Sequence, residues 1–271
     1  MKKTDMALVQ ADPWQRLRAH TSARIALGRV GASMPTDEVL RFGLAHAQAR
    51  DAVHHPMASD DLRTRLSAAG FNALDTVRSQ APDRHAYLLR PDLGRRLDDA
   101  CREALASSSD ATGGHENELV IVIADGLSSV AVERHSVALL EAFRDVYEVD
   151  WAHVPVVIVE QGRVAVGDDI AEALKARIVV VLIGERPGLS SPDSLGIYFT
   201  WQPRVGKMDS ERNCISNVRP EGLVYEAAAA KLAHMLRQAS RLQLTGVALK
   251  DDSDAPALKS SSDTAQHGGG S

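Results

Sequence analysis

Three continuous runs of β-branched and aliphatic residues constrain the fold of this 271-residue chain more than any other feature. They cover residues 119–124, 154–159 and 178–183, and none alternates with polar residues. Strands that are apolar on both faces are typical of a parallel sheet buried between helices. The stretches between the runs carry apolar residues at helical spacing. This order predicts an α/β fold, a Rossmann-like doubly wound parallel sheet with right-handed crossovers.

The rest of the chain divides by composition and periodicity. Residues 1–11 are predicted to be a flexible N-terminus, and residues 12–106 a mostly helical N-terminal region. Residues 107–116 are rich in Ser and Gly, which indicates a linker. The Rossmann-like domain then spans residues 117–249. The polar segment 250–271 ends in Gly-Gly-Gly-Ser and is predicted to be a disordered tail.

Helix starts are marked by capping and first-turn residues. In the N-terminal region, helices are expected to begin near Asp12-Pro13 and Pro35, and a third to cover residues 91–105. We expect Asp168 to cap the helix after the second apolar run. A last helix, residues 221–242, has one apolar face and completes the domain.

Composition excludes several classes of partner. A net charge of −5 and an aromatic content of 4% give no reason to expect nucleic acid. No apolar run approaches the roughly 20 residues that span a bilayer, and the first residues lack a secretory signal. Two cysteines, Cys101 and Cys214, are too few for a disulfide framework or a four-cysteine zinc site. We therefore expect a cytoplasmic protein that contacts neither nucleic acid nor membrane.

Three loops follow the apolar runs, at residues 125–129, 161–164 and 184–188. Ligands of open parallel sheets bind beyond the carboxyl ends of the strands, so these loops mark a binding edge. Their glycines allow a ligand to approach the backbone closely. An ordinary interpretation remains open: the loops are simple turns, Asp125 caps a helix, and Glu185 is a solvated charge.

No familiar catalytic constellation is present in the sequence. Gly-x-Gly-x-x-Gly and Gly-x-Ser-x-Gly are both missing. Cys214 has no identifiable partner base, which favours a buried structural thiol. His54-His55 has no second group of ligands at a sensible spacing, so we expect a surface pair and no protein metal site. Also missing is Asp-x-His-x-x-Gly, the motif by which some cobalamin proteins supply a histidine to cobalt.

Six short segments match one known family in the family's order, over about residues 14–245. They are LRAHTSARIALGRVG (17–31), YLLRPDLGRRL (87–97), ADGLS (124–128), GRV (162–164), VLIGERPGL (181–189) and RNCISNV (212–218). Any one is a weak signal, whereas six in order, with VLIGERPGL and CISN among them, are strong. On these segments the chain resembles the small subunit of adenosylcobalamin-dependent ethanolamine ammonia-lyase.

The resemblance implies a division of labour between two subunits. The large subunit, a TIM barrel, carries the ethanolamine site, and adenosylcobalamin lies between it and the Rossmann-like small subunit. Cobalt–carbon homolysis then starts the radical deamination of ethanolamine to acetaldehyde and ammonia. The cofactor keeps its own dimethylbenzimidazole on cobalt, in agreement with the missing histidine motif. The family's cobalamin contacts carry over to Val164, Glu185 and Cys214, and no catalytic residue is expected on this chain.

Some features of the sequence allow more than one interpretation. The basic segments at residues 16–29 and 90–96 either face the large subunit or form a solvated basic face. Some family members begin with an extension associated with packaging into a bacterial microcompartment. This chain reaches the family core by Asp12-Pro13-Trp14, so we expect packaging only if the partner carries the signal. The alternatives to this function are a stand-alone Rossmann-like enzyme and a structural subunit without cofactor contact.

Overall fold

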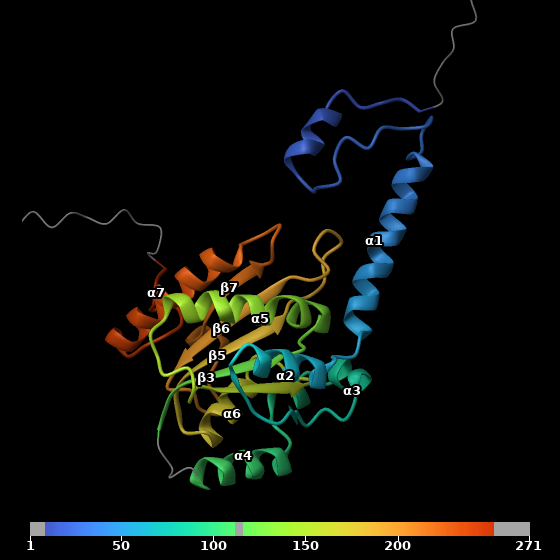
Figure 1. Ribbon diagram of the computed structural model, residues 1–271. Helices are drawn as coiled ribbons and strands as arrows, with labels where there is room; N and C mark the ends of the chain where they lie inside the picture. The colour runs from blue at the N-terminus through green and yellow to red at the C-terminus, as the bar shows by residue number, and fades with distance from the viewer. Residues whose placement is uncertain (1–8, 112–115, 252–271) are drawn as a thin grey trace, which may run out of the picture.

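The computed structural model describes residues 9–111 and 116–251, and within them it shows one seven-stranded sheet covered by helices (Figure 1). The strand order is β1-β4-β3-β5-β6-β7, and β2 also pairs with β4. The strands are β1 (Asn72–Ala73), β2 (Val77–Arg78), β3 (Asn117–Ala124), β4 (Pro155–Glu160), β5 (Ala176–Gly184), β6 (Leu195–Trp201) and β7 (Asn213–Val218). The three predicted apolar runs form β3, β4 and β5.

The strands β1 to β5 pair in parallel, which confirms the predicted α/β fold. Val122 of β3 lies between Val157 of β4 and Val181 of β5, at the centre of the sheet. In contrast, β6 and β7 pair antiparallel and extend the sheet on one side. This antiparallel edge was not predicted, and it places part of the matched segment 212–218 in a strand rather than in a loop.

Helices cover both faces of the sheet because alternate residues of each central strand are buried on opposite sides. Ile121 and Ile123 pack with α2, α5 and α7, whereas Val120 and Val122 pack with α4 and α6. The helices are α1 (Thr36–His54), α2 (Ser59–Ala68), α3 (Arg84–Leu89), α4 (Asp99–Ala111), α5 (Ser129–Val146), α6 (Val166–Ala173) and α7 (Tyr225–Leu242).

The helix expected after Pro35 is confirmed as α1. The one expected near Asp12-Pro13 is only a 3₁₀ helix, Gln15–His20. The helix expected over 91–105 is split into a 3₁₀ turn, Leu93–Arg95, and α4. The interruption has a visible cause: the backbone N–H of Leu97 donates to a carboxylate oxygen of Asp169 at 2.9 Å instead of continuing a helix.

The predicted linker does not separate the N-terminal region from the sheet. Helix α4 continues to Ala111, so residues 107–111 are helical, and residues 112–115 lie outside the described residues. Furthermore, β1 and β2 precede this segment and still pair with β4. Most of the predicted tail and the first eight residues also lie outside the described residues, while Gln10 of the predicted flexible N-terminus pairs with Arg29.

Residues 9–51 project from the body of the molecule, and we refer to them as the N-terminal arm (Figure 1). The arm contains the 3₁₀ helix and most of α1. Elsewhere α2, α5, α6 and α7 contact strands of the sheet, and α4 packs against α6. Among residues 9–111 and 116–251, no helix combines the length and the apolar character that crossing a membrane requires.

Candidate functional site

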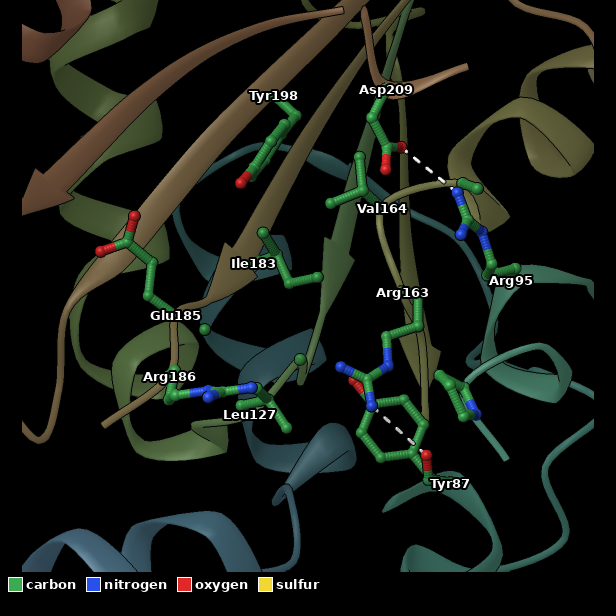
Figure 2. A pocket seen from close by; sticks show the side chains of 14 residues that line it. Tyr87, Arg95, Leu127, Arg163, Val164, Ile183, Glu185, Arg186, Tyr198 and Asp209 are labelled. Atoms are coloured by element: carbon green, nitrogen blue, oxygen red, sulfur yellow. Dashed lines mark hydrogen bonds and ion pairs between the residues drawn. The ribbon is translucent and has the colours of Figure 1, made fainter. Parts of the chain in front are cut away.

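A cavity of about 550 Å³ opens at the carboxyl ends of β3, β4 and β5 (Figure 2). Residues 126–127 follow β3, residues 163–165 follow β4, and residues 184–186 end β5 and begin the next loop. Tyr87 of α3 and Tyr198 of β6 complete two of its walls. The three strand-end loops that the sequence placed along one edge therefore line a single cavity.

Two glycines let the ends of β3 and β5 approach each other. Gly126 has a φ of +56°, and a Cβ atom built there would lie 2.3 Å from the carbonyl oxygen of Gly184. A Cβ atom at Gly184 would lie 2.0 Å from the carbonyl oxygen of Ser128. The backbone N–H of Leu127 donates to that same Gly184 oxygen at 2.9 Å. Any side chain at either position would force the two strand ends apart.

Asp125 is buried directly beneath the cavity. Its Oδ1 accepts a hydrogen bond from the backbone N–H of Gly162 at 3.0 Å, and its Oδ2 lies 3.1 Å from Nη1 of Arg84. Burial raises the pKa of Asp125 to about 6, against the opposing charge of Arg84. Asp125 therefore joins the loops after β3 and β4, and its carboxylate oxygens are bonded to these partners rather than to a helix N-terminus.

Tyr87 forms the floor of the cavity between two guanidinium groups. The guanidinium carbons of Arg163 and Arg84 lie 4.2 Å and 4.8 Å from the centre of its ring. Its hydroxyl donates to the carbonyl oxygen of Gly162 at 3.0 Å, and burial raises its pKa, so the phenol stays protonated. Nε of Arg163 is buried and has no hydrogen-bond partner within the described part of the chain. Arg163 itself lines the cavity, so its guanidinium group borders the space that is open to a ligand.

Val164, a predicted site residue, lies in the cavity wall. It is half-buried, and Figure 2 shows it near Ile183 and Tyr198 on the side of the cavity away from Glu185. Together with Leu127 and Ile183, it gives the cavity an apolar surface between the charged groups.

Glu185, the second predicted site residue, is half-buried and is held in place by neighbours. Its Oε2 accepts hydrogen bonds from the hydroxyl of Ser194 and from the backbone N–H of Asn217, the latter at 3.3 Å. Its own backbone N–H donates to the carbonyl oxygen of Ser194 at 2.9 Å. The carboxylate thus bridges the loop after β5 to β7, which excludes the alternative of a freely solvated charge.

Cys214, the third predicted site residue, lies outside the cavity wall and is exposed on the edge strand β7. The expectation of a buried structural thiol is therefore wrong, because edge strands turn alternate side chains to solvent. Cys214 pairs with Tyr198 in the β6–β7 ladder. Burial, together with a hydrogen bond to Cys214, raises the pKa of Tyr198, which itself lines the cavity. Cys214 therefore contacts a residue that lines the cavity, Tyr198, although it does not line the cavity itself.

Asp168 was expected to cap α6, and this is also wrong. Helix α6 begins at Val166, and both Asp168 oxygens bond the guanidinium of Arg212 at 2.7 Å and 2.6 Å. This buried pair fixes the start of β7 against α6. Its arginine, Arg212, lies two residues before Cys214.

Two contributors to this site were missed by sequence reasoning. Arg84 lies on a different element from its partner Asp125, and Tyr198 lies in a strand that was not predicted. By contrast, Tyr87 and Arg163 lie in two of the matched segments, which was the available signal for them. Among the described residues, no group of three or more His, Cys, Asp or Glu side chains is arranged to hold a metal ion.

Comparison with known proteins agrees with the matched segments. A family model described as "Ethanolamine ammonia-lyase light chain (EutC)" matches residues 11–250. The chain is 53% identical over 256 residues to a protein of Azotobacter vinelandii. The aligned region covers 94% of this chain and 94% of that relative. It is 54% identical over 248 residues to a protein of Xanthomonas campestris pv. campestris. It is 55% identical over 252 residues to a protein of Pseudomonas aeruginosa strain LESB58. Both alignments cover 91% of this chain and 90% of the relative. All three relatives carry the name ethanolamine ammonia-lyase small subunit.

Proposed function

The chain belongs to the ethanolamine ammonia-lyase light-chain family, and on this premise we propose that its strand-end cavity holds one part of adenosylcobalamin while a large subunit holds the rest. The relatives' name, small subunit, implies the large-subunit partner. The observation that carries the proposal is that Val164 and Glu185, which lie on different loops, line the same cavity.

The residues of the cavity fit this cofactor. The periphery of cobalamin is rich in amide groups, which both donate and accept hydrogen bonds. The carboxylate of Glu185 accepts from amide N–H groups, and the guanidinium of Arg163, which also lines the cavity, donates to an amide or phosphate oxygen. The apolar surface at Val164 packs against the ring.

The size of the cavity supports a site shared between two subunits. Cavities of roughly 300–1,000 Å³ bury most of a drug-sized ligand. This cavity has about 550 Å³, and cobalamin is larger than such ligands. The chain therefore covers only part of the cofactor, and a second protein surface is needed to exclude water from the remainder.

In this proposal the chain positions the cofactor and does not process the substrate. When bound, adenosylcobalamin supplies the radical chemistry that deaminates ethanolamine to acetaldehyde and ammonia. The phenol of Tyr87 stays protonated, and Asp125 is occupied by Arg84 and Gly162. Neither group is free to act as a base on ethanolamine, so we assign the substrate site to the large subunit.

Reconstitution tests the proposal. We expect no ethanolamine deamination from this chain alone, and turnover when the chain, the large subunit and adenosylcobalamin are combined. Turnover by the chain alone would favour the stand-alone enzyme, and full turnover by the large subunit alone would contradict a role in catalysis. The change in cobalamin absorbance when the chain joins the large subunit separates cofactor contact from a purely structural role.

A further inference from the structure

We propose that the N-terminal arm, residues 9–51, is the surface on which the large subunit docks, through apolar contacts surrounded by ion pairs from its arginines. This inference rests on the proposed function, because it assigns residues to the partnership that the function requires.

The arm exposes far more apolar surface than it buries. Of residues 9–51, all of which the structure describes, only Pro35 and Glu38 are buried. The arm nevertheless holds ten of the seventeen large apolar side chains that are exposed among the described residues. These ten are Val9, Trp14, Leu17, Ile25, Val30, Met34, Val39, Leu40, Phe42 and Leu44. A concentration of exposed apolar side chains in one segment indicates an interaction site, since exposed apolar groups contribute little to the stability of the free chain.

The arm has internal contacts that give this surface a defined shape. Glu38 accepts hydrogen bonds from Arg18 at 2.8 Å and from Arg41 at 3.2 Å, which ties the segment before α1 to α1 itself. The guanidinium of Arg24 lies 5.8 Å from the centre of the Phe42 ring. A surface that is partly ordered before binding loses less conformational entropy when the partner docks.

Charge favours the large subunit over a second copy of this chain. Residues 9–51 contain six arginines and four acidic residues, although the whole chain has a net charge of −5. A symmetric contact between two arms would bring together two surfaces of the same positive net charge, and like charges across an interface oppose association. The arm fits instead a partner that presents an apolar patch rimmed by acidic side chains.

The position of the arm places such a partner beside the cavity. Nη2 of Arg24 donates to the carbonyl oxygen of Leu189 at 3.3 Å. Leu189 belongs to the same loop as Glu185 and Arg186, which line the cavity. Figure 1 shows the part of the arm that precedes α1 at the outer end of that helix, on the side toward which the loop after β5 extends. A subunit docked on the arm therefore lies next to the open side of the cofactor site.

A pair of substitutions on one face of α1 tests the proposal. Leu40 and Leu44 are 68% and 61% exposed, so Leu40→Asp with Leu44→Asp introduces charge without removing core packing. The matched control is Leu242→Asp with Val247→Asp, at positions that are 49% and 82% exposed outside the arm. We expect the arm variant to bind the purified large subunit about 100-fold more weakly and the control to stay within about threefold, as measured by fluorescence anisotropy.

Hydrogen exchange of the wild-type complex gives a second readout that needs no variant. We expect amides of residues 9–51 to gain protection when the large subunit binds. Equal affinity of the arm variant and the control, or an arm without added protection in the complex, would overturn the proposal. Cobalamin absorbance of the wild-type complex is recorded in parallel. A complex that forms through the arm but leaves cobalamin absorbance unchanged contradicts the proposed function alone, whereas a cobalamin-binding complex with an unprotected arm contradicts the docking surface alone.

Discussion

Arg84 places its Nη1 atom 3.1 Å from Oδ2 of Asp125 and so joins α3 to the carboxyl end of β3. The same nitrogen donates to the carbonyl oxygen of Gly126 at 2.9 Å, and Nε donates to that of Val53, near the end of α1, at 2.6 Å. One side chain thus holds together three segments that meet under the cavity. In the proposed function, this network fixes the loop on which the cofactor rests.

The raised pKa of Asp125 predicts a specific dependence of stability on pH. Its value is about 6 in the folded chain and 3.8 for an ordinary aspartate. Between these values the folded chain binds a proton that the unfolded chain has released, so this contribution to stability is present at low pH and is lost as pH rises through about 6. In urea unfolding, the free energy of unfolding of wild type relative to Asp125→Asn should fall by about 1 kcal/mol from pH 5 to pH 7. Parallel pH profiles for the two proteins would contradict this assignment.

The buried pair of Arg212 and Asp168 predicts a large loss of stability on substitution. Both side chains are only 2% exposed, so Arg212→Met leaves a buried carboxylate without its partner. Such a change destabilises a protein by about 3–5 kcal/mol. The control is Arg177→Met, which removes an exposed pair with Glu116 and should cost less than about 1 kcal/mol. Similar unfolding midpoints for both variants, from urea titrations at pH 7, would show that the buried pair is not a structural tie.

The central sheet was predictable because its strands are apolar on both faces. Leu119 to Ala124 can be buried only between two layers of helices, and that leaves one common class of fold. The antiparallel edge was not predictable in the same way. In β7, Cys214, Ser216 and Asn217 face solvent, so the strand lacks the apolar run by which the central strands were recognised.

The candidate site was predictable where it depends on strand ends. Val164 and Glu185 lie in the loops after β4 and β5, so the direction of parallel strands brings them to one edge. The support beneath them was not predictable, since Arg84 and Asp125 are 41 residues apart and no local pattern links the two. The same holds for Asp168 and Arg212, which are 44 residues apart.

Pro187 is predicted to shape the loop rather than to take part in chemistry. Proline fixes φ and restricts the preceding Arg186 to extended geometry. Pro187→Ala should therefore loosen the loop that carries Glu185 and weaken cobalamin retention about two- to fivefold, the equivalent of the roughly 0.4–1 kcal/mol that a compatible proline contributes. Pro220→Ala, at an exposed position outside the cavity, is the control. Lost turnover with unchanged cobalamin affinity would argue against this role.

The most direct test is a cobalamin titration of assemblies that contain wild-type chain, Glu185→Gln, or the control Glu226→Gln on the exposed first turn of α7. Glutamine keeps the shape of Glu185 but loses its charge and one acceptor oxygen. Hydrogen bonds to a charged group are worth roughly 1.5–3 kcal/mol, so we expect about tenfold weaker cobalamin binding at a matched subunit ratio, with ethanolamine affinity unchanged. The control should bind cobalamin like wild type. Equal cobalamin dissociation constants for all three assemblies would contradict the account that this cavity holds the cofactor.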